Sequence, residues 1–148
     1  MLTIHAADEV RRAWDAEPLK DGAVAVEGTR VAAVGPLAEL ERRFPGARVR
    51  RWPGVLGPAR VHEGPLPQAP SPRERVHEVL KLGATAVLAR HADSAALREA
   101  AARNDVAVLP DARSVAVLEG ERADLAVFDD TGACLATVCA GRLVHRRR

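Results

Sequence analysis

"DGAVAVEGTRVAAVG", residues 21–35, is the stretch from which the fold of this chain can first be predicted. Two runs rich in Val and Ala flank the tripeptide Glu27-Gly28-Thr29. Gly28 can adopt the positive φ that a tight hairpin turn needs, and the β-branched valines on either side favour strands. The stretch therefore predicts a β-hairpin.

The segments next to this hairpin extend the same small sheet. "LTIHAA" (2–7) and "ARVRRW" (47–52) each predict a short strand. "PLAELERRF" (36–44) predicts one helix over a sheet edge, because its apolar residues recur at helical spacing and Pro45-Gly46 ends the pattern.

The chain from Trp52 to Pro72 is rich in proline. Proline lacks the backbone N–H that helix interiors and central strands use, so we expect neither element there. The segment is predicted to be a linker or a draped loop, and the chief internal boundary of the chain.

After this boundary the pattern changes to a parallel α/β unit. Ser71 with Pro72 and Glu74 predicts the start of a helix that ends at Gly83. A buried strand "ATAVLAR" (84–90), a helix over 94–103 and a strand "VAVLP" (106–110) follow. Two strands that alternate with helices across short turns predict a small parallel arrangement.

From residue 115 the sequence predicts β-structure again. "VAVLEGERADLAVFDD" is expected to turn at Gly120, and "CLATVCA" (134–140) and "RLVHR" (142–146) follow as strands. Short turns between them predict an antiparallel meander.

Composition narrows the class of protein. The chain has 148 residues, a net charge of +2 and 47% hydrophobic residues. Basic residues are interleaved with acidic ones and few aromatic side chains are present, so nucleic-acid binding is not expected. No apolar run approaches the roughly 20 residues of a membrane span, and the first residues do not resemble a signal peptide. Cys134 and Cys139 should point to opposite faces of one strand without pairing, which favours the reducing cytoplasm.

Both ends of the chain resemble the composite β-sandwich of the metal-dependent amidohydrolase superfamily, most closely imidazolonepropionase and the aminodeoxyfutalosine deaminases. The resemblance rests on "DGAVAVEGTRVAAVGP", "FPGARVRRWPGVLGPARV" and "VLEGERADLAVFDDTGACLATVCAGRLVH". It implies a single α+β domain in which residues 1–62 and 115–148 form the sandwich. Residues 63–114 then hold the proline-rich linker and a small parallel α/β insert, since a (β/α)8 barrel of about 250 residues cannot fit.

The resemblance also implies where a catalytic metal would bind. In the family a proline-led turn enters the first barrel strand and ends in a His-x-His pair, whose alternate residues share one face. "LGPARVHEGPL" (56–66) places His62 at an acidic position of the family and Gly64 and Leu66 where the two histidines stand. Neither residue can ligate a metal, so we expect neither a metal nor another cofactor. Adjacent His62 and Glu63 point opposite ways on an extended chain and cannot chelate one ion.

Three other residues have a geometric argument for a site. His91 and Asp93 follow the strand over 84–90, and Asp111 follows the strand over 106–110. The carboxyl ends of parallel strands meet at the crevice where α/β folds bind ligands. The alternative is structural: Asp93 caps the next helix and Asp111 a turn.

The remaining histidines and cysteines carry weaker arguments. His77 is expected on a helix surface. His5 and His145 lie in terminal strands that could be neighbours, but two histidines without a third ligand make a weak metal site. Cys139 is expected in the core and Cys134 near a turn.

These observations favour a non-catalytic, amidohydrolase-like binding or interaction module, with a small molecule or a protein as its partner and a homodimer as its form. One alternative is a residual hydrolase of non-peptide C–N bonds in a cyclic amide or amidine, in which His91 acts with Asp93 or Asp111 as an acid/base pair. Another is a subunit that completes a second protein, because a two-stranded parallel fragment is marginal alone.

Overall fold

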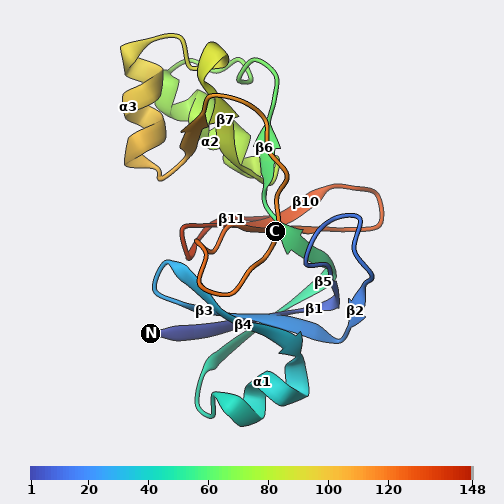
Figure 1. The fold of residues 1–148 in the computed structure, drawn as a ribbon. Coiled ribbons are helices and arrows are strands. Elements are labelled where there is room, and N and C mark those ends of the chain that lie inside the picture. The colour runs from blue at the N-terminus through green and yellow to red at the C-terminus, as the bar shows by residue number, and fades with distance from the viewer. Residues whose placement is uncertain (148) are drawn as a thin grey trace.

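The computed structural model describes residues 1–147, in which two β-sheets and three α-helices form a mixed α+β fold (Figure 1). The larger sheet has eight strands in the order β11-β10-β9-β5-β1-β3-β4, with β2 paired to β1. Its strands are β1 (Leu2–Val10), β2 (Leu19–Lys20), β3 (Gly22–Glu27), β4 (Arg30–Pro36), β5 (Arg48–Pro58), β9 (Leu125–Phe128), β10 (Cys134–Cys139) and β11 (Arg142–Arg146). The α+β class expected from the sequence is confirmed.

The predicted hairpin is present as strands β3 and β4. Gly28 at its turn has a φ of 61°, which is the left-handed conformation that glycine adopts without a Cβ clash. The turn is tied to the other end of the chain, since Ala123 N donates to the Thr29 carbonyl over 2.7 Å and Val31 N to the Glu121 carbonyl over 2.9 Å. The predicted meander is also present, as β9, β10 and β11.

Strand β5 joins the two ends of the chain in one sheet. It runs parallel to β1, with Arg50 opposite His5, and antiparallel to β9, with Leu56 opposite Val127. In Figure 1, β10 and β11 lie above β1, β3 and β4. One apolar core combines residues of these two levels: Ala7, Val10, Val24, Val26, Val31, Val34, Trp52, Leu56, Val117, Ala123, Leu125, Val127, Ala136 and Val138.

Helix α1 (Leu37–Arg43) covers the other face of the β1-β3-β4 part of the sheet. Leu40 is buried there among Ile4, Ala6, Ala23, Ala25 and Ala33. The small alanines bring the helix close to the sheet. The predicted helix over 36–44 is thus confirmed, and Pro36 precedes it as the N-cap residue.

The second sheet is parallel and has the order β6-β7-β8. Its strands are β6 (Arg60–His62), β7 (Ala84–Leu88) and β8 (Ala107–Leu109), and helices α2 (Pro72–Lys81) and α3 (Ala95–Arg103) pack beside it in the upper part of Figure 1. The Ser71 side chain caps α2 by accepting from Glu74 N over 3.2 Å, as the sequence predicts. Helix α2 also contacts β10 and β11 and so docks this unit on the larger sheet.

The prediction that residues 52–72 hold no central strand is wrong. Strand β5 continues to Pro58 between β1 and β9. Pro53 is tolerated because the β1-β5 pairing is irregular at this point, so no regular ladder bond is lost. Gly54 has a φ of 91°, and its N–H donates to an Asp8 carboxylate oxygen over 2.9 Å.

Two further expectations need correction. The α/β unit has three parallel strands rather than two, because Arg60–His62 pairs with β7. A three-residue strand between prolines gives almost no periodic signal. Residues 115–119 do not form a strand in the described chain; Val117 instead lies in the core, and its N–H donates to the Arg12 carbonyl over 2.7 Å.

Within residues 1–147, no helix combines the length and apolar character needed to cross a membrane.

Candidate functional site

The positions expected for a metal-binding pair are not suited to a metal. Leu66 is only 3% exposed and packs in the apolar core with Val76 and Val79 of α2. Gly64 has no side chain and faces open space. Both residues lie beyond the end of β6, so they do not share a strand face as the alignment supposed. Around the start of β6, a cavity between the two sheets is lined by Pro58, Ala59, Arg60 and Val61, and none of these side chains is a metal ligand.

His62 and Glu63 lie along a shallow hollow of about 480 Å³ beside Phe128 and Cys134. The His62 Nε2 atom lies 2.9 Å from the Pro65 carbonyl oxygen, so one ring nitrogen is engaged in a hydrogen bond to that carbonyl. Glu63 is exposed. This arrangement gives His62 a structural partner within its own loop.

His91, Asp93 and Asp111 lie at the carboxyl ends of β7 and β8, as predicted. His91 ends a short 3₁₀ turn and is half-buried, whereas Asp93 and Asp111 are exposed. No hydrogen bond or ion pair joins any two of them among the described side chains. The alternative role of Asp93 is wrong as well, because Ser94 is the N-cap of α3 and accepts from Leu97 N over 3.1 Å.

The remaining histidines are not brought together. His5 is 3% exposed, and its Nδ1 accepts from Trp52 Nε1 over 3.2 Å. His145 lies on β11, which is separated from β1 by three other strands, so these two strands are not neighbours in the sheet. His77 is exposed on α2. Within residues 1–147, no group of three or more His, Cys, Asp or Glu side chains is arranged to hold a metal ion.

A cavity of about 370 Å³ lies where the two sheets meet, and we call it the junction cavity. Its floor is formed by the first residues of the small sheet's strands, and its outer wall by the segment that leads into β9. The cavity is lined by Pro58, Ala59, Arg60, Val61, Thr85, Ala86, Ala107, Arg113, Ser114, Val115, Ala116, Leu118, Glu121, Arg122 and Asp124. It lies at the opposite end of these strands from His91, Asp93 and Asp111.

An ion pair between Arg122 and Asp124 forms one corner of the junction cavity. Arg122 Nε donates to both Asp124 carboxylate oxygens, over 3.0 and 2.8 Å, and Ala140 N donates to Asp124 Oδ1 over 3.0 Å. Burial disfavours the charge on Arg122, but the hydrogen bond and charge of Asp124 outweigh it and raise the pKa of Arg122. The guanidinium therefore stays charged beside the cavity.

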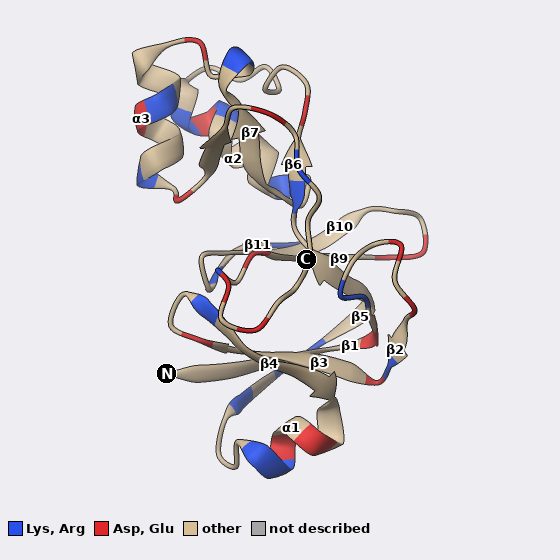
Figure 2. Ribbon diagram, in the orientation of Figure 1, with Lys and Arg blue, Asp and Glu red and all other residues tan. Residues whose placement is uncertain are grey.

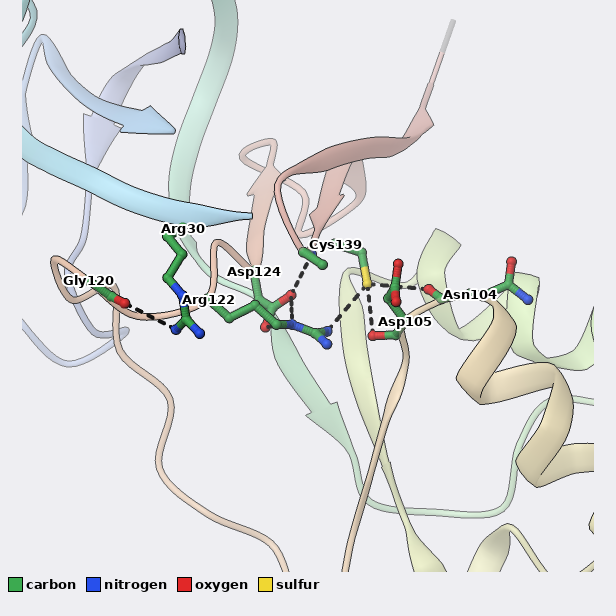
Figure 3. Close-up of polar contacts among 8 residues, drawn as sticks. Arg30, Asn104, Asp105, Gly120, Arg122, Asp124 and Cys139 are labelled. Carbon is green, nitrogen blue, oxygen red and sulfur yellow. Dashed lines mark hydrogen bonds and ion pairs between the residues drawn. The ribbon is translucent and has the colours of Figure 1, made fainter. Parts of the chain in front are cut away.

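The same corner connects the two sheets. Figure 3 shows Arg122 between Asp124 and Cys139, whose sulfur faces the turn after α3. Arg122 Nη2 lies 3.5 Å from Cys139 Sγ, which lies 3.4 Å from the Asp105 carbonyl oxygen. Burial raises the pKa of Cys139 to about 12, so this thiol stays protonated and can donate to that carbonyl. Cys139 is thus a structural contact rather than a nucleophile.

Other polar side chains around the junction cavity lack internal partners. Thr85 is 4% exposed and makes no hydrogen bond to another described side chain, and its hydroxyl opens into the cavity, because no described side-chain polar atom is both shut off from solvent and unpaired. Arg113 forms no ion pair within the described chain. Arg60 differs, because its guanidinium lies 4.0 Å from the Phe128 ring centroid and 5.5 Å from that of Trp14. Figure 2 shows basic and acidic residues interleaved over the chain, so this is not one broad basic surface.

Sequence reasoning did not select the junction-cavity residues. Asp124 lies in a segment used for the family resemblance, "ADLAVFD", but nothing in that pattern indicates an ion pair with Arg122. Thr85 looks like an ordinary β-former inside an apolar run. A single hydroxyl within a run of buried positions was the one available signal.

The fold is similar to part of several solved enzyme structures. The chain is similar to ochratoxinase from A. niger (TM-score 0.52, 19% identity, 73% of this chain and 29% of that one). It is also similar to guanine deaminase from E. coli (0.55, 17%, 72% and 34%) and to an adenosine deaminase from Xanthomonas campestris with bound zinc (0.51, 19%, 70% and 32%). The chain thus spans about a third of their length, and these identities show similarity of fold alone.

A family model matches one part of the sequence. The imidazolonepropionase-like composite domain of bacteria matches residues 22–47, which include the β3-β4 hairpin and α1. No curated protein matches the chain at a significant level. The predicted resemblance to the amidohydrolase composite domain is confirmed by the family model and the solved structures together.

Proposed function

We propose that this chain is a non-catalytic, amidohydrolase-like binding module. In this proposal residues 1–62 and 115–148 supply the composite β-sandwich, and residues 63–114 supply a small α/β insert where relatives carry a barrel. The pairing of β5 with both β1 and β9 supports the first part, because it joins both ends of the chain in one sheet. The parallel sheet supports the second, because two of its three described strands, β7 and β8, lie within residues 63–114, while β6 lies at the end of the preceding segment.

One observation carries the proposal that the chain is non-catalytic. Leu66, at a position inferred for a metal-binding histidine, is part of the apolar core between the small sheet and α2. A metal site needs polar donors with their own supporting hydrogen bonds, and this position offers aliphatic carbon instead. The residues of this chain therefore do not fit the metal that the fold family implies.

The binding role rests on the junction cavity. Its volume of about 370 Å³ lies within the range of small-molecule sites, and its lining combines apolar side chains with a few polar groups. Among the described side chains that line it, the side-chain hydrogen bonds join Arg122 to Asp124 and none joins a hydroxyl to a base, as a nucleophile and base pair for hydrolysis would need. Cytoplasmic location and the absence of membrane and nucleic-acid partners remain part of the proposal.

Metal analysis tests the non-catalytic role. The chain is purified without chelators, its zinc and iron content is measured, and hydrolysis of cyclic amides and amidines is assayed with and without added zinc. We expect far less than one metal ion per chain and no zinc-dependent turnover. One zinc or iron per chain, or turnover that disappears with a chelator and returns with zinc, would contradict the proposal.

We further propose a homodimer. Strands β6 and β8 form the edges of the small sheet, and Val108 on β8 is 36% exposed, so an apolar edge is accessible for pairing. Light scattering across a concentration series should give twice the chain mass. A mass of one chain at every concentration would refute the dimer without affecting the ligand-binding proposal.

A further inference from the structure

We propose that the junction cavity binds a small organic monoanion, whose carboxylate is held by Arg113 and Arg122 while its apolar part lies against the alanines of β7 and β8. This inference rests on the proposed function as a binding module. It adds the chemical class of the ligand and the residues that select it.

The Thr85 hydroxyl is the first observation that indicates a ligand. Thr85 is 4% exposed and lines the cavity, and no described side-chain polar atom is both shut off from solvent and unpaired, so its hydroxyl is open to the cavity. A polar group of a ligand can replace the water at such a hydroxyl without loss of affinity when it makes the same hydrogen bond. A molecule inside the cavity would give this hydroxyl its partner.

The two arginines of the outer wall supply the second observation. Arg122 donates hydrogen bonds from Nε to Asp124 and from Nη2 to Cys139 Sγ. Its Nη1 makes no hydrogen bond within the described chain. Arg113 is exposed, lines the same cavity and has no ion-pair partner among residues 1–147. A guanidinium with free N–H groups is well matched to a carboxylate, because the two groups are planar and complementary in charge.

The charge of the lining favours a single negative charge. Arg60, Arg113 and Arg122 contribute three positive charges, and Glu121 and Asp124 contribute two negative ones, which leaves a formal charge of +1. Arg60 is stacked on Phe128, so it adds to the electrostatic potential rather than to direct contact. A ligand with one negative charge would balance the formal charge of the lining, whereas a ligand with several would leave negative charge without a positive partner.

The apolar part of the lining limits the size and character of the ligand. Ala86 in the middle of β7 and Ala107 at the start of β8 leave space where larger side chains would fill the cavity. Leu118 lines the outer wall and is 52% exposed, so a ligand could cover it. The volume of about 370 Å³ is near the lower end for ligand sites, which favours a ligand of one ring or a short acyl chain.

An NMR titration of the full chain tests the ligand class. Benzoate is the probe, and benzamide and benzylammonium are matched neutral and cationic compounds. We expect benzoate to shift the amides of Thr85, Ala86, Ala107 and Ser114 saturably, and to bind about tenfold more tightly than benzamide. Raising the salt concentration should weaken benzoate binding because the attraction is partly exposed to solvent.

Three variants locate the interaction. R113Q should weaken benzoate binding about tenfold, whereas R103Q makes the same change of charge on α3, outside the cavity, and should leave it unchanged. Thr85→Val keeps the shape of the side chain and should weaken binding by a smaller factor. Arg122 is left intact because it connects the two sheets.

The outcomes separate this inference from the function on which it rests. Equal binding of benzoate and benzamide at the cavity amides would overturn the anion while leaving a binding module. Equal weakening by R113Q and R103Q, or no saturable shift at the cavity, would overturn the site. Zinc-dependent turnover would instead overturn the proposed function and is measured separately.

Discussion

Acid should destabilise this protein through one buried histidine. His5 Nδ1 accepts the indole N–H of Trp52 over 3.2 Å, so the ring is held neutral with its other nitrogen protonated. Burial, and then the charge of Arg50, lower the pKa of His5 from 6.5 to about 4. Protonation would place a new N–H against the Trp52 donor and a charge inside the core.

The size of this effect follows from proton linkage. Below pH 6.5 the unfolded chain takes up a proton at His5, while the folded chain resists until about pH 4. The contribution is therefore complete above pH 6.5 and is lost as the pH falls towards 4. At about 1.4 kcal/mol per pH unit, the interval between the two pKa values corresponds to roughly 3 kcal/mol of unfolding free energy.

Urea unfolding followed by tryptophan fluorescence and circular dichroism between pH 7.5 and 4 measures this loss. H5N can still accept from Trp52 and does not titrate, so it should flatten the pH dependence of the unfolding free energy above pH 4, whatever its stability at pH 7.5. H77N, which removes an exposed histidine of α2, should keep the wild-type pH dependence. Carboxylates titrate in wild type and H5N alike, so the difference between their unfolding free energies at each pH isolates the contribution of His5. Identical pH dependence in wild type and H5N, or an NMR pKa of His5 near 6.5, would refute the reasoning.

Three other substitutions have expected effects on stability. Gly54→Ala should lower the unfolding free energy by at least about 2 kcal/mol, because Gly54 has a φ of 91° and a Cβ there would collide with a β9 carbonyl. Gly132→Ala is the control: Gly132 has a φ of 86° but open space around it, so the loss measured by urea unfolding should be about 1 kcal/mol. Equal losses in the two variants would contradict the collision. Asp124→Asn should lower the unfolding free energy by about 1–2 kcal/mol, because it removes the charge that pairs with Arg122 in a partly solvent-screened position. An unchanged melting temperature would show that the Arg122–Asp124 pair does not stabilise the fold. Ser71→Ala should cost about 1 kcal/mol through the lost N-cap of α2, and Ser71→Asp should restore it in the same assay.

Local patterns predicted most of the secondary structure, because the relevant interactions are short in sequence. The hairpin at Gly28, helix α1 and the Ser71 cap of α2 all depend on residues within a few positions of each other. The continuation of strand β5 beyond Trp52 was missed for a tertiary reason. Its prolines are accommodated by an irregular pairing with β1 and by the end of the strand, and neither is visible in the residues themselves.

For the candidate site, too, the sequence determined some features and the tertiary structure determined others. The sequence alone establishes that Gly64 and Leu66 cannot ligate a metal, because this follows from residue type. It directed attention to His91, Asp93 and Asp111 by a rule for parallel sheets, but those side chains do not form a connected cluster in the described chain.

By itself the sequence determined the α+β class, the hairpin, the three helices and the resemblance of both ends to an amidohydrolase composite domain. Only the tertiary structure decided that Thr85, Arg113 and Arg122 surround one cavity and that Leu66 lies in a core. The physical reason is that propensity, capping and turn chemistry act between near neighbours along the chain. A cavity is instead defined by side chains that meet across distant segments, and their positions depend on how the two sheets pack.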